Sequence, residues 1–330
     1  MNPVLVTGAS GMLGAGLCRH LVEDGEEVVA LVRRPLTHPL LSGLAIRQTI
    51  GDLLDEDSLR KAMEGCEGVY HAAGAISYRD ADRGHLYRTN LEGTLNVLRA
   101  AADSSIRRVV FTSSTAAVGI PDDDQEPLHE GSAFHPRYER VPYMASKRAA
   151  EEAALQQSDV EVVAVNPATI YGEGDVYFNT GALFRQIAQK KLGWVPPGGT
   201  SVVSLQDCVD GHLLAMEKGV PGQRYILSSH HPSYRELMGS MAKALGVEAP
   251  SRTMPRSLEP LAWFAGALHD HCVPASLQHR TFSRHVVNIG FRKRFFDSTR
   301  ARKDLGWTPV QSLDDMIAEA AAFYAQYKLL

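Results

Sequence analysis

Tyr143 and Lys147 stand four residues apart in the segment YMASK, at the start of a stretch rich in alanine and glutamate. On a helix the two side chains would share one face, with their β-carbons about 5–6 Å apart. A neighbouring ammonium favours the phenolate and lowers a tyrosine pKa that is about 10 when unperturbed, so we expect Tyr143 to exchange a substrate proton near neutral pH. The same spacing recurs at Tyr324 and Lys328. No glycine loop or hydroxyl cluster lies near them in the sequence, and we interpret Tyr324 as a packing residue.

A glycine-rich loop near the start of the chain supplies a second chemical signal. Gly8, Gly11 and Gly14 lie between an apolar run and a helical stretch, with G-x-x-G-x-x-G spacing. In such a loop the first glycine allows a tight turn, the second lets a pyrophosphate approach the backbone, and the third lets helix pack on strand. The helix N-terminus adds unpaired N–H groups and a partial positive charge. The predicted dinucleotide-binding residues here are Gly8, Ser10, Gly11, Met12, Leu13 and Gly14.

The end of the second predicted strand indicates which dinucleotide is preferred. NAD-selective folds usually place an acidic residue there, where it accepts hydrogen bonds from the ribose hydroxyls. This chain has Arg33 and Arg34 instead, in the segment LVRRP. A guanidinium suits a 2′-phosphate in both charge and geometry. We therefore expect NADP(H) to be preferred, while NAD(H) stays open if the two arginines are only a solvated surface pair.

Hydroxyl side chains gather in the segment FTSSTAAVG (111–119), directly after another apolar run. Ligands of open α/β sheets bind at the carboxyl ends of the strands, where this segment would lie. Ser114 is predicted to orient a substrate carbonyl, and Ser113 to contact the cofactor. Ser114, Tyr143 and Lys147 form the predicted catalytic group, in which Lys147 would also reach the ribose hydroxyls.

The segments that would position these residues alternate between short apolar runs, which are typical of buried strands, and stretches with helical hydrophobic spacing. Strands alternating with helices indicate βαβ units and a mostly parallel sheet that is covered on both faces. We expect an α/β fold, a Rossmann-like doubly wound parallel sheet with a smaller C-terminal substrate lobe. Residues 1–170, with about 200–228, would bind the cofactor, and about 171–199 with 229–330 would bind the substrate. Strands are predicted at 3–7, 27–32, 68–73, 107–114, 160–166 and 223–228, and helices at 11–24, 55–64, 84–103, 143–157 and 205–218.

Composition excludes several kinds of partner. The 330 residues include 44% hydrophobic and 22% charged side chains, as in an ordinary globular protein. A net charge of −4 gives no reason to expect nucleic acid or an anionic membrane.

The apolar stretch 258–273 is too short and too polar to span a bilayer. Its HDHC segment does not predict a metal site, because adjacent helical residues point apart. Four scattered cysteines fit buried, reduced thiols in a cytoplasmic protein.

Further segments extend these signals along nearly the whole chain. They are TGASGMLG (7–14), GDLLD (51–55), HAAG (71–74), TNLEGTLNVLRAA (89–101), FTSS (111–114), YMASK (143–147), NPATIYG (166–172) and FDSTRARKDLGWTP (296–309).

With these segments the chain resembles the extended short-chain dehydrogenase/reductase superfamily, which includes the NAD-dependent epimerase/dehydratase family. The resemblance implies that Asp52 and Leu53 border the adenine of the cofactor. It also implies an NAD(P)-dependent oxidoreductase acting on a small molecule, with a homodimer as an expected assembly. It further implies that Ala72, Ala73 and Asn90 line the cofactor and that Pro167 and Ala168 face the nicotinamide.

Two branches of this superfamily compete. ALVRRP and VVFTSSTAAV resemble dihydroflavonol 4-reductases and 3β-hydroxysteroid dehydrogenase-like reductases, which reduce ketones or aldehydes with NADPH. Nucleotide-sugar epimerases and dehydratases usually have an acid where Arg33 stands, and commonly an arginine for the diphosphate where Thr200 stands. We therefore expect an NADPH-dependent carbonyl reductase, or the reverse alcohol dehydrogenase. The alternatives are an NAD-dependent nucleotide-sugar epimerase or dehydratase, and a protein that only senses NADP without catalysis.

Overall fold

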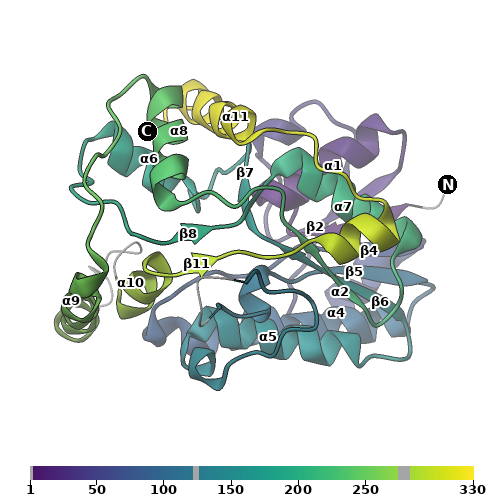
Figure 1. The fold of residues 1–330 in the computed structure, drawn as a ribbon. Helices are drawn as coiled ribbons and strands as arrows, with labels where there is room; N and C mark the ends of the chain where they lie inside the picture. The colour runs from purple at the N-terminus through teal and green to yellow at the C-terminus, as the bar shows by residue number, and fades with distance from the viewer. Residues whose placement is uncertain (1–2, 122–125, 274–282) are drawn as a thin grey trace.

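A seven-stranded parallel sheet forms the centre of the molecule in a computed structural model that describes residues 3–121, 126–273 and 283–330 (Figure 1). The strand order is β10-β6-β5-β4-β1-β2-β3, and every neighbouring pair is parallel. The order reverses between β1 and β4, where such sheets bind ligands. The predicted Rossmann-like fold is therefore confirmed. The strands are β1 (Val4–Thr7), β2 (Val28–Val32), β3 (Arg47–Ile50), β4 (Gly68–His71), β5 (Arg108–Thr112), β6 (Glu161–Pro167) and β10 (Arg224–Leu227).

Strand β3 is missing from the sequence prediction. Its residues, RQTI, are mostly exposed because β3 is the last strand at one edge of the sheet. It therefore lacks the continuous apolar pattern of a strand buried on both faces. As a consequence, the hydroxyl segment 111–119 follows the fifth strand of the chain and not the fourth.

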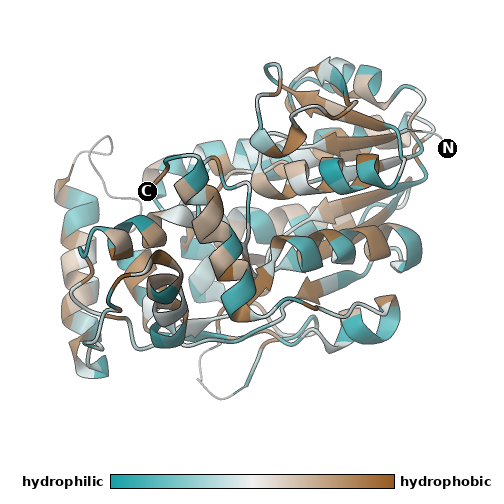
Figure 2. Ribbon diagram, turned by 90° about the horizontal axis from the view of Figure 1, so that it is seen from above, coloured by the Kyte–Doolittle hydropathy of each residue, from teal (hydrophilic) through white to brown (hydrophobic). Residues whose placement is uncertain are grey.

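Helices cover both faces of the sheet (Figure 1), and Figure 2 shows the molecule from above one of these faces. Alternate strand residues point to opposite faces, so Val4 and Val6 join one core and Leu5 the other. The predicted helix over 84–103 is interrupted by a π-helical turn at Tyr87–Glu92. The first face is covered by α1 (Met12–Glu23) and α7 (Leu205–Lys218), and the second by α2 (Glu56–Met63), α3 (Arg83–Leu86), α4 (Gly93–Ala102) and α5 (Pro142–Leu155).

A smaller lobe lies beyond the carboxyl ends of the strands (Figure 1). Its core includes Tyr324, whose side chain is fully buried and donates a hydrogen bond to Asp175 Oδ2 at 2.9 Å. This confirms the interpretation of Tyr324 as a packing residue. The elements of this lobe are β7 (Thr169–Tyr171) paired with β9 (Val202–Ser204), β8 (Gly199–Thr200) paired with β11 (Lys293–Arg294), and α6 (Gly181–Ala188), α8 (Tyr234–Leu245), α9 (Glu259–Cys272), α10 (Arg284–Gly290) and α11 (Leu313–Gln326).

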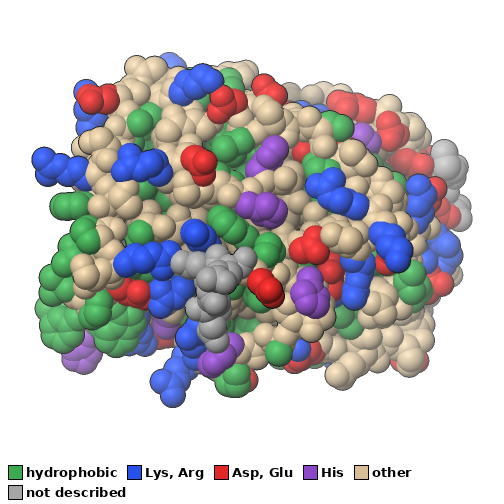
Figure 3. All heavy atoms as spheres, viewed as in Figure 1, with side chains coloured by type: hydrophobic (Ala, Val, Ile, Leu, Met, Phe, Trp, Pro, Cys, Tyr) green, Lys and Arg blue, Asp and Glu red, His purple; other side chains and the backbone are tan. Residues whose placement is uncertain are grey.

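Helix α9 has an unusual surface. Its large apolar side chains Leu261, Trp263, Phe264 and Leu268 are exposed, and hydrophobic atoms gather over it at the lower left of Figure 3. Among the described residues no helix combines the length and the apolar character that a membrane crossing requires. All four cysteines are free thiols. The expectation that all are buried is wrong for Cys272, which lies exposed at the end of α9.

Candidate active site

The glycine loop turns directly from β1 into α1. Gly8 has a φ of +76°, and a Cβ there would lie 2.7 Å from the backbone nitrogen of Ala73. A Cβ on Gly14 would lie 2.2 Å from the Gly8 carbonyl oxygen, so both glycines are required by the fold itself. A Cβ on Gly11 would approach nothing closer than 3.4 Å. The space beside Gly11 therefore fits a ligand phosphate placed against the backbone.

The other predicted loop residues differ in what they present. Ser10 is exposed, whereas the side chains of Met12 and Leu13 pack into the core beneath the loop. Gly11 caps α1 without a side chain of its own, so the first N–H groups of the helix are available to an anion. Met12 and Leu13 would contact a cofactor through these backbone groups.

Arg33 and Asp52 lie side by side at the ends of β2 and β3. Val32 and Ile50 are register partners, and the next residue, Gly51, donates to the Val32 carbonyl at 3.0 Å. The Arg33 side chain is exposed. The Asp52 carboxylate accepts the Leu54 N–H at 2.9 Å, which fixes the loop.

The turn at Leu53 and the loop after β4 are held by asparagine side chains. Asn96 Nδ2 donates to the Leu53 carbonyl at 2.8 Å. Asn90 accepts from the Ala75 N–H at 2.8 Å and donates to Ser146 Oγ at 3.0 Å, so it ties this loop to α5. Ala72 and Ala73 are partly buried at the start of the same loop, and the Ala73 N–H donates to Thr7 Oγ1 at 3.2 Å.

Tyr143, Lys147 and Ser114 converge at the carboxyl ends of β5 and β6. Tyr143 and Lys147 are one turn apart on α5 and are 7% and 6% exposed. The Ser114 side chain lies beside the Tyr143 hydroxyl and favours its ionised form, and its Oγ accepts the Ala116 N–H at 3.1 Å. Lys147 Nζ donates to the Thr112 carbonyl at 2.9 Å and lies 5.2 Å from the centre of the Phe111 ring. The structure thus brings the three predicted catalytic side chains together, and their roles stay predictions.

The expected lowering of the Tyr143 pKa is wrong. Burial raises the pKa of Tyr143 well above its ordinary value, the neighbouring Tyr78 adds to the rise, and the polar side chain of Ser114 opposes it. Desolvation of the phenolate therefore outweighs the attraction that we expected from Lys147. At neutral pH Tyr143 is protonated, which is the form that donates a proton.

Lys147 belongs to a chain of buried charges that sequence reasoning missed. Burial lowers the pKa of Lys147 from 10.5 to about 8, and the carboxylate of Glu151 opposes this shift. Glu151 Oε1 in turn accepts from Arg224 Nη1 at 2.7 Å, and Glu151 also accepts from Asn166. Glu151 lies four residues after Lys147, and that helical spacing is the signal that could have revealed it.

Two more missed residues support the site. His71 bridges Thr7 Oγ1 at 2.8 Å and Thr94 Oγ1 at 3.0 Å. Burial, together with the charge of Lys147, lowers the pKa of His71 to about 3, so this histidine is neutral. The ring of Tyr78 packs edge-to-face on Tyr143 with centroids 5.7 Å apart.

Ser113, Pro167 and Ala168 line the edge between β5, β6 and β10. The Ser113 N–H donates to the Val165 carbonyl at 2.7 Å, but its buried Oγ has no hydrogen-bond partner. Pro167 ends β6, and the Ala168 N–H donates to the Leu227 carbonyl at 2.9 Å. An unpartnered buried hydroxyl at this edge fits a polar ligand that binds there.

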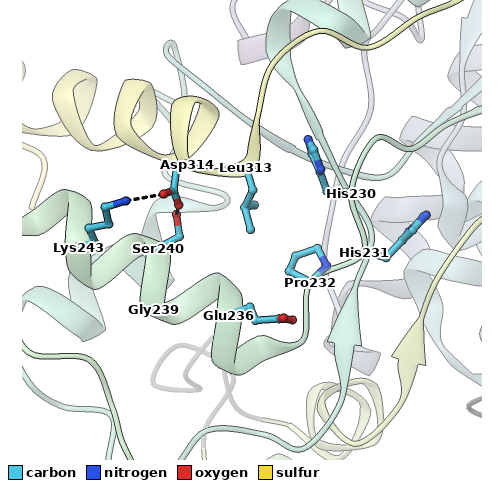
Figure 4. Close-up of a pocket in the computed structure, with 9 residues that line it drawn as sticks. All are labelled: His230, His231, Pro232, Glu236, Gly239, Ser240, Lys243, Leu313 and Asp314. Carbon is cyan, nitrogen blue, oxygen red and sulfur yellow. Dashed lines mark hydrogen bonds and ion pairs between the residues drawn. The ribbon is translucent and has the colours of Figure 1, made fainter.

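A surface hollow of about 460 Å³ lies elsewhere on the smaller lobe, and Figure 4 shows its lining. In it Asp314 accepts from Lys243 and from Ser240, both at 2.6 Å. None of the predicted site residues lines this hollow. Among residues 3–121, 126–273 and 283–330, no three histidine, cysteine or acidic side chains gather as they would around a metal ion.

Comparison with known proteins places the chain among characterised families. Sterol demethylase protein B of Methylococcus capsulatus is 33% identical over 326 residues, which cover 98% of both chains. The putative dihydroflavonol 4-reductase of Synechocystis sp. is 32% identical over 331 residues, covering 98% of this chain and 94% of that protein. The crystal structure of gox2253 superposes with a TM-score of 0.85 at 28% identity, covering 99% of both chains.

The family match spans more than half of the chain and includes the predicted cofactor-binding and catalytic residues. Residues 4–228 match the NAD dependent epimerase/dehydratase family, a range that includes the glycine loop and the Ser114, Tyr143 and Lys147 group. The chain therefore belongs to this family and is an NAD(P)-dependent oxidoreductase of the extended short-chain dehydrogenase/reductase type.

Proposed function

We propose that the protein is an NADPH-dependent reductase of a ketone or aldehyde, or an alcohol dehydrogenase in the reverse direction. The observation that carries this proposal is the buried Tyr143 beside Ser114, one helical turn from a Lys147 ammonium that is held on the Thr112 carbonyl. A buried phenol at neutral pH is a proton donor, which is what reduction of a carbonyl requires. The name of the Synechocystis relative, a putative reductase, agrees with this direction.

The residues around the sheet edge fit a dinucleotide. The glycine loop and the N-terminus of α1 would hold the pyrophosphate, and Asp52 and Leu53 would border the adenine. Ala72, Ala73, Asn90 and Ser113 would line the cofactor, with Pro167 and Ala168 at its nicotinamide end. When bound, the nicotinamide supplies or accepts the hydride. We assign this role to residues 1–170 with about 200–228, and substrate binding to about 171–199 with 229–330.

The side chains of the site divide the remaining work. The Tyr143 hydroxyl would give its proton to the carbonyl oxygen of the substrate, and Ser114 would orient that oxygen through its own hydroxyl. Lys147 would hold ribose hydroxyls while its ammonium is anchored on the Thr112 carbonyl. Asn90 and Ser146 fix the loop and the helix that carry these groups relative to each other.

A nucleotide-sugar epimerase or dehydratase is the second candidate, since the matching family carries that description. Such an enzyme would retain NAD through its cycle. The exposed Arg33 at the end of β2 argues for NADP(H) instead, because a guanidinium suits a 2′-phosphate better than a pair of ribose hydroxyls. A protein that only senses NADP is disfavoured by the assembled Ser114, Tyr143 and Lys147 group.

Cofactor preference separates these candidates. Arg33→Ala should weaken NADPH binding about 10- to 100-fold, the value of one charged hydrogen-bonded contact, while NADH binding changes little. The measurement is fluorescence titration of both cofactors, with exposed Arg107→Ala as a matched control. Mass spectrometry of nucleotide released from freshly purified protein complements it. Equal losses for both cofactors, or tightly held NAD, would contradict the NADPH assignment.

A further inference from the structure

Arg294 is placed in the smaller lobe by the pairing of β11 with β8. It is the register partner of Thr200, and its Nη2 donates to Thr200 Oγ1 at 3.0 Å and to the Tyr234 hydroxyl at 3.4 Å. Thr200 leads into Ser201 and β9, which pairs with β7, the strand directly after Pro167 and Ala168. Thr200 Oγ1 lies 3.5 Å from the hydroxyl of Thr169, the residue after Ala168, so the guanidinium is near the proposed nicotinamide end of the site.

The Arg294 side chain is partly buried, and one of its nitrogens has no hydrogen-bond partner. Its Nε is fully buried and has no hydrogen-bond acceptor, and among the described residues no carboxylate pairs with it. Other arginines here are paired, as Arg224 is with Glu151 and Arg292 with Glu259, both at 2.7 Å. A buried donor without an acceptor is costly, so the Arg294 Nε is available to an acceptor from outside the chain.

Tyrosine side chains connect Arg294 to the catalytic group. The charge of Arg294 acts on the phenols of Tyr78, Tyr171 and Tyr234, opposing the burial that raises the pKa of Tyr78 and Tyr171. The Tyr78 ring packs on Tyr143 with centroids 5.7 Å apart. Tyr78 thus interacts with both groups, electrostatically with the guanidinium and by ring packing with the proposed proton donor.

We propose that Arg294 binds a carboxylate of the substrate, placed a few bonds from the carbonyl that Tyr143 protonates. The substrate class would then be a keto acid. This inference rests on the proposed function. A guanidinium also suits phosphate, but the link to Tyr143 through the one residue Tyr78 favours the more compact carboxylate, because a phosphate esterified beyond the reacting carbon needs a longer span.

The test compares acids with their neutral esters under NADPH. Wild-type kcat/KM should be higher for 3-oxooctanoate and 4-oxooctanoate than for the corresponding methyl esters. Arg294→Gln should lower kcat/KM for the acids about 10- to 100-fold more than for the esters, and Arg294→Lys should restore part of the difference. Exposed Arg302→Gln, from the same terminal segment, should leave the acid-to-ester ratio as in the wild type.

The other outcomes are equally decisive. Esters preferred over acids, or dihydroxyacetone phosphate preferred over both, would overturn the carboxylate assignment while leaving the reductase intact. If the wild type reduces no ketone, the proposed function fails. Binding of 3-hydroxyoctanoate with NADP+ by calorimetry then decides the role of Arg294. Weaker binding to Arg294→Gln than to the wild type supports it, and no difference overturns it. The wild-type comparison and Arg294→Lys keep the test valid if Arg294→Gln folds poorly.

Discussion

Lys147 is a buried cation: burial destabilises its charged form, and the carboxylate of Glu151 stabilises it. Its ammonium has one backbone acceptor, the Thr112 carbonyl at 2.9 Å, and the carboxylate of Glu151 one turn further along α5. The carboxylate of Glu151 also forms an ion pair with Arg224. The amine therefore stays charged at neutral pH, as ribose binding requires, although the folded protein lowers its pKa to about 8.

This lowered pKa predicts how stability varies with pH. Because the pKa of Lys147 is about 8 in the folded protein and 10.5 as a reference, the unfolded state binds more protons between these values. The free-energy cost of burying the charged Lys147 amine is fully present below pH 8 and is lost as the pH rises to 10.5. Lys147→Met should therefore raise Tm relative to the wild type by on the order of 5 °C at pH 7, and by clearly less at pH 10.

Thermal unfolding of both proteins at several pH values gives the comparison. Lys218→Met, at an exposed position near the end of α7, serves as the control and should show a Tm difference independent of pH. A Tm difference between Lys147→Met and wild type that is the same at pH 7 and pH 10 would contradict this electrostatic account.

At the scale of residues, the spacing along a helix predicted which side chains lie together, whereas contacts between distant parts of the chain could not be predicted. Tyr143 and Lys147 were predictable as a pair, because four residues on a helix always lie on one face. The direction of the Tyr143 pKa was not, because it depends on burial and on Tyr78, 65 positions earlier in the chain. Arg294 reaches the same region only through the pairing of β11 with β8, which two-residue strands do not announce in the sequence.

At the scale of elements, two glycines of the β1–α1 turn have different functions, Gly14 in packing and Gly11 in the proposed phosphate binding. A Cβ on Gly14 meets the Gly8 carbonyl oxygen at 2.2 Å, whereas one on Gly11 has no contact closer than 3.4 Å. Gly14→Ala should therefore destabilise the protein, although Gly to Ala normally favours a helix. Gly11→Ala should keep the wild-type Tm and lose most dinucleotide affinity, because its methyl occupies the space proposed for phosphate.

Tm and NADPH dissociation constants for the two variants provide the measurement. Gly239→Ala in α8 is the matched control, since a Cβ there meets nothing within 4 Å. It should leave cofactor affinity unchanged and slightly raise Tm. Full NADPH affinity in Gly11→Ala would show that the loop does not hold the pyrophosphate as proposed.

Most elements were predictable because buried strands and amphipathic helices carry clear periodic patterns. The strand β3 was missed because it lies exposed at the sheet edge and has few apolar residues to form a recognisable pattern. The π-helical turn Tyr87–Glu92 was also missed, because it keeps the helical hydrophobic pattern while placing Asn90 against the loop after β4. The short strands β7, β8, β9 and β11 have no pattern long enough to identify.

At the scale of the whole molecule, the proposed site combines the sheet edge with the smaller lobe. In this proposal Ser113 and Ser114 follow β5, α5 carries Tyr143 and Lys147, and the smaller lobe adds Arg294. The family match covers residues 4–228, where most of the motifs lie, whereas the proposed substrate class depends on a segment outside that match. Cytoplasmic location and a homodimer stay predictions from the sequence.

The central claim is that Tyr143 protonates a carbonyl oxygen during NADPH-dependent reduction. The most direct measurement is the rate of NADPH oxidation with a panel of ketones and aldehydes, for the wild type and for Tyr143→Phe. Phenylalanine keeps the ring packed on Tyr78 and removes only the hydroxyl, so folding and NADPH affinity should be retained. We predict that turnover falls by about 10²- to 10⁴-fold. Near-normal turnover by Tyr143→Phe would contradict the account.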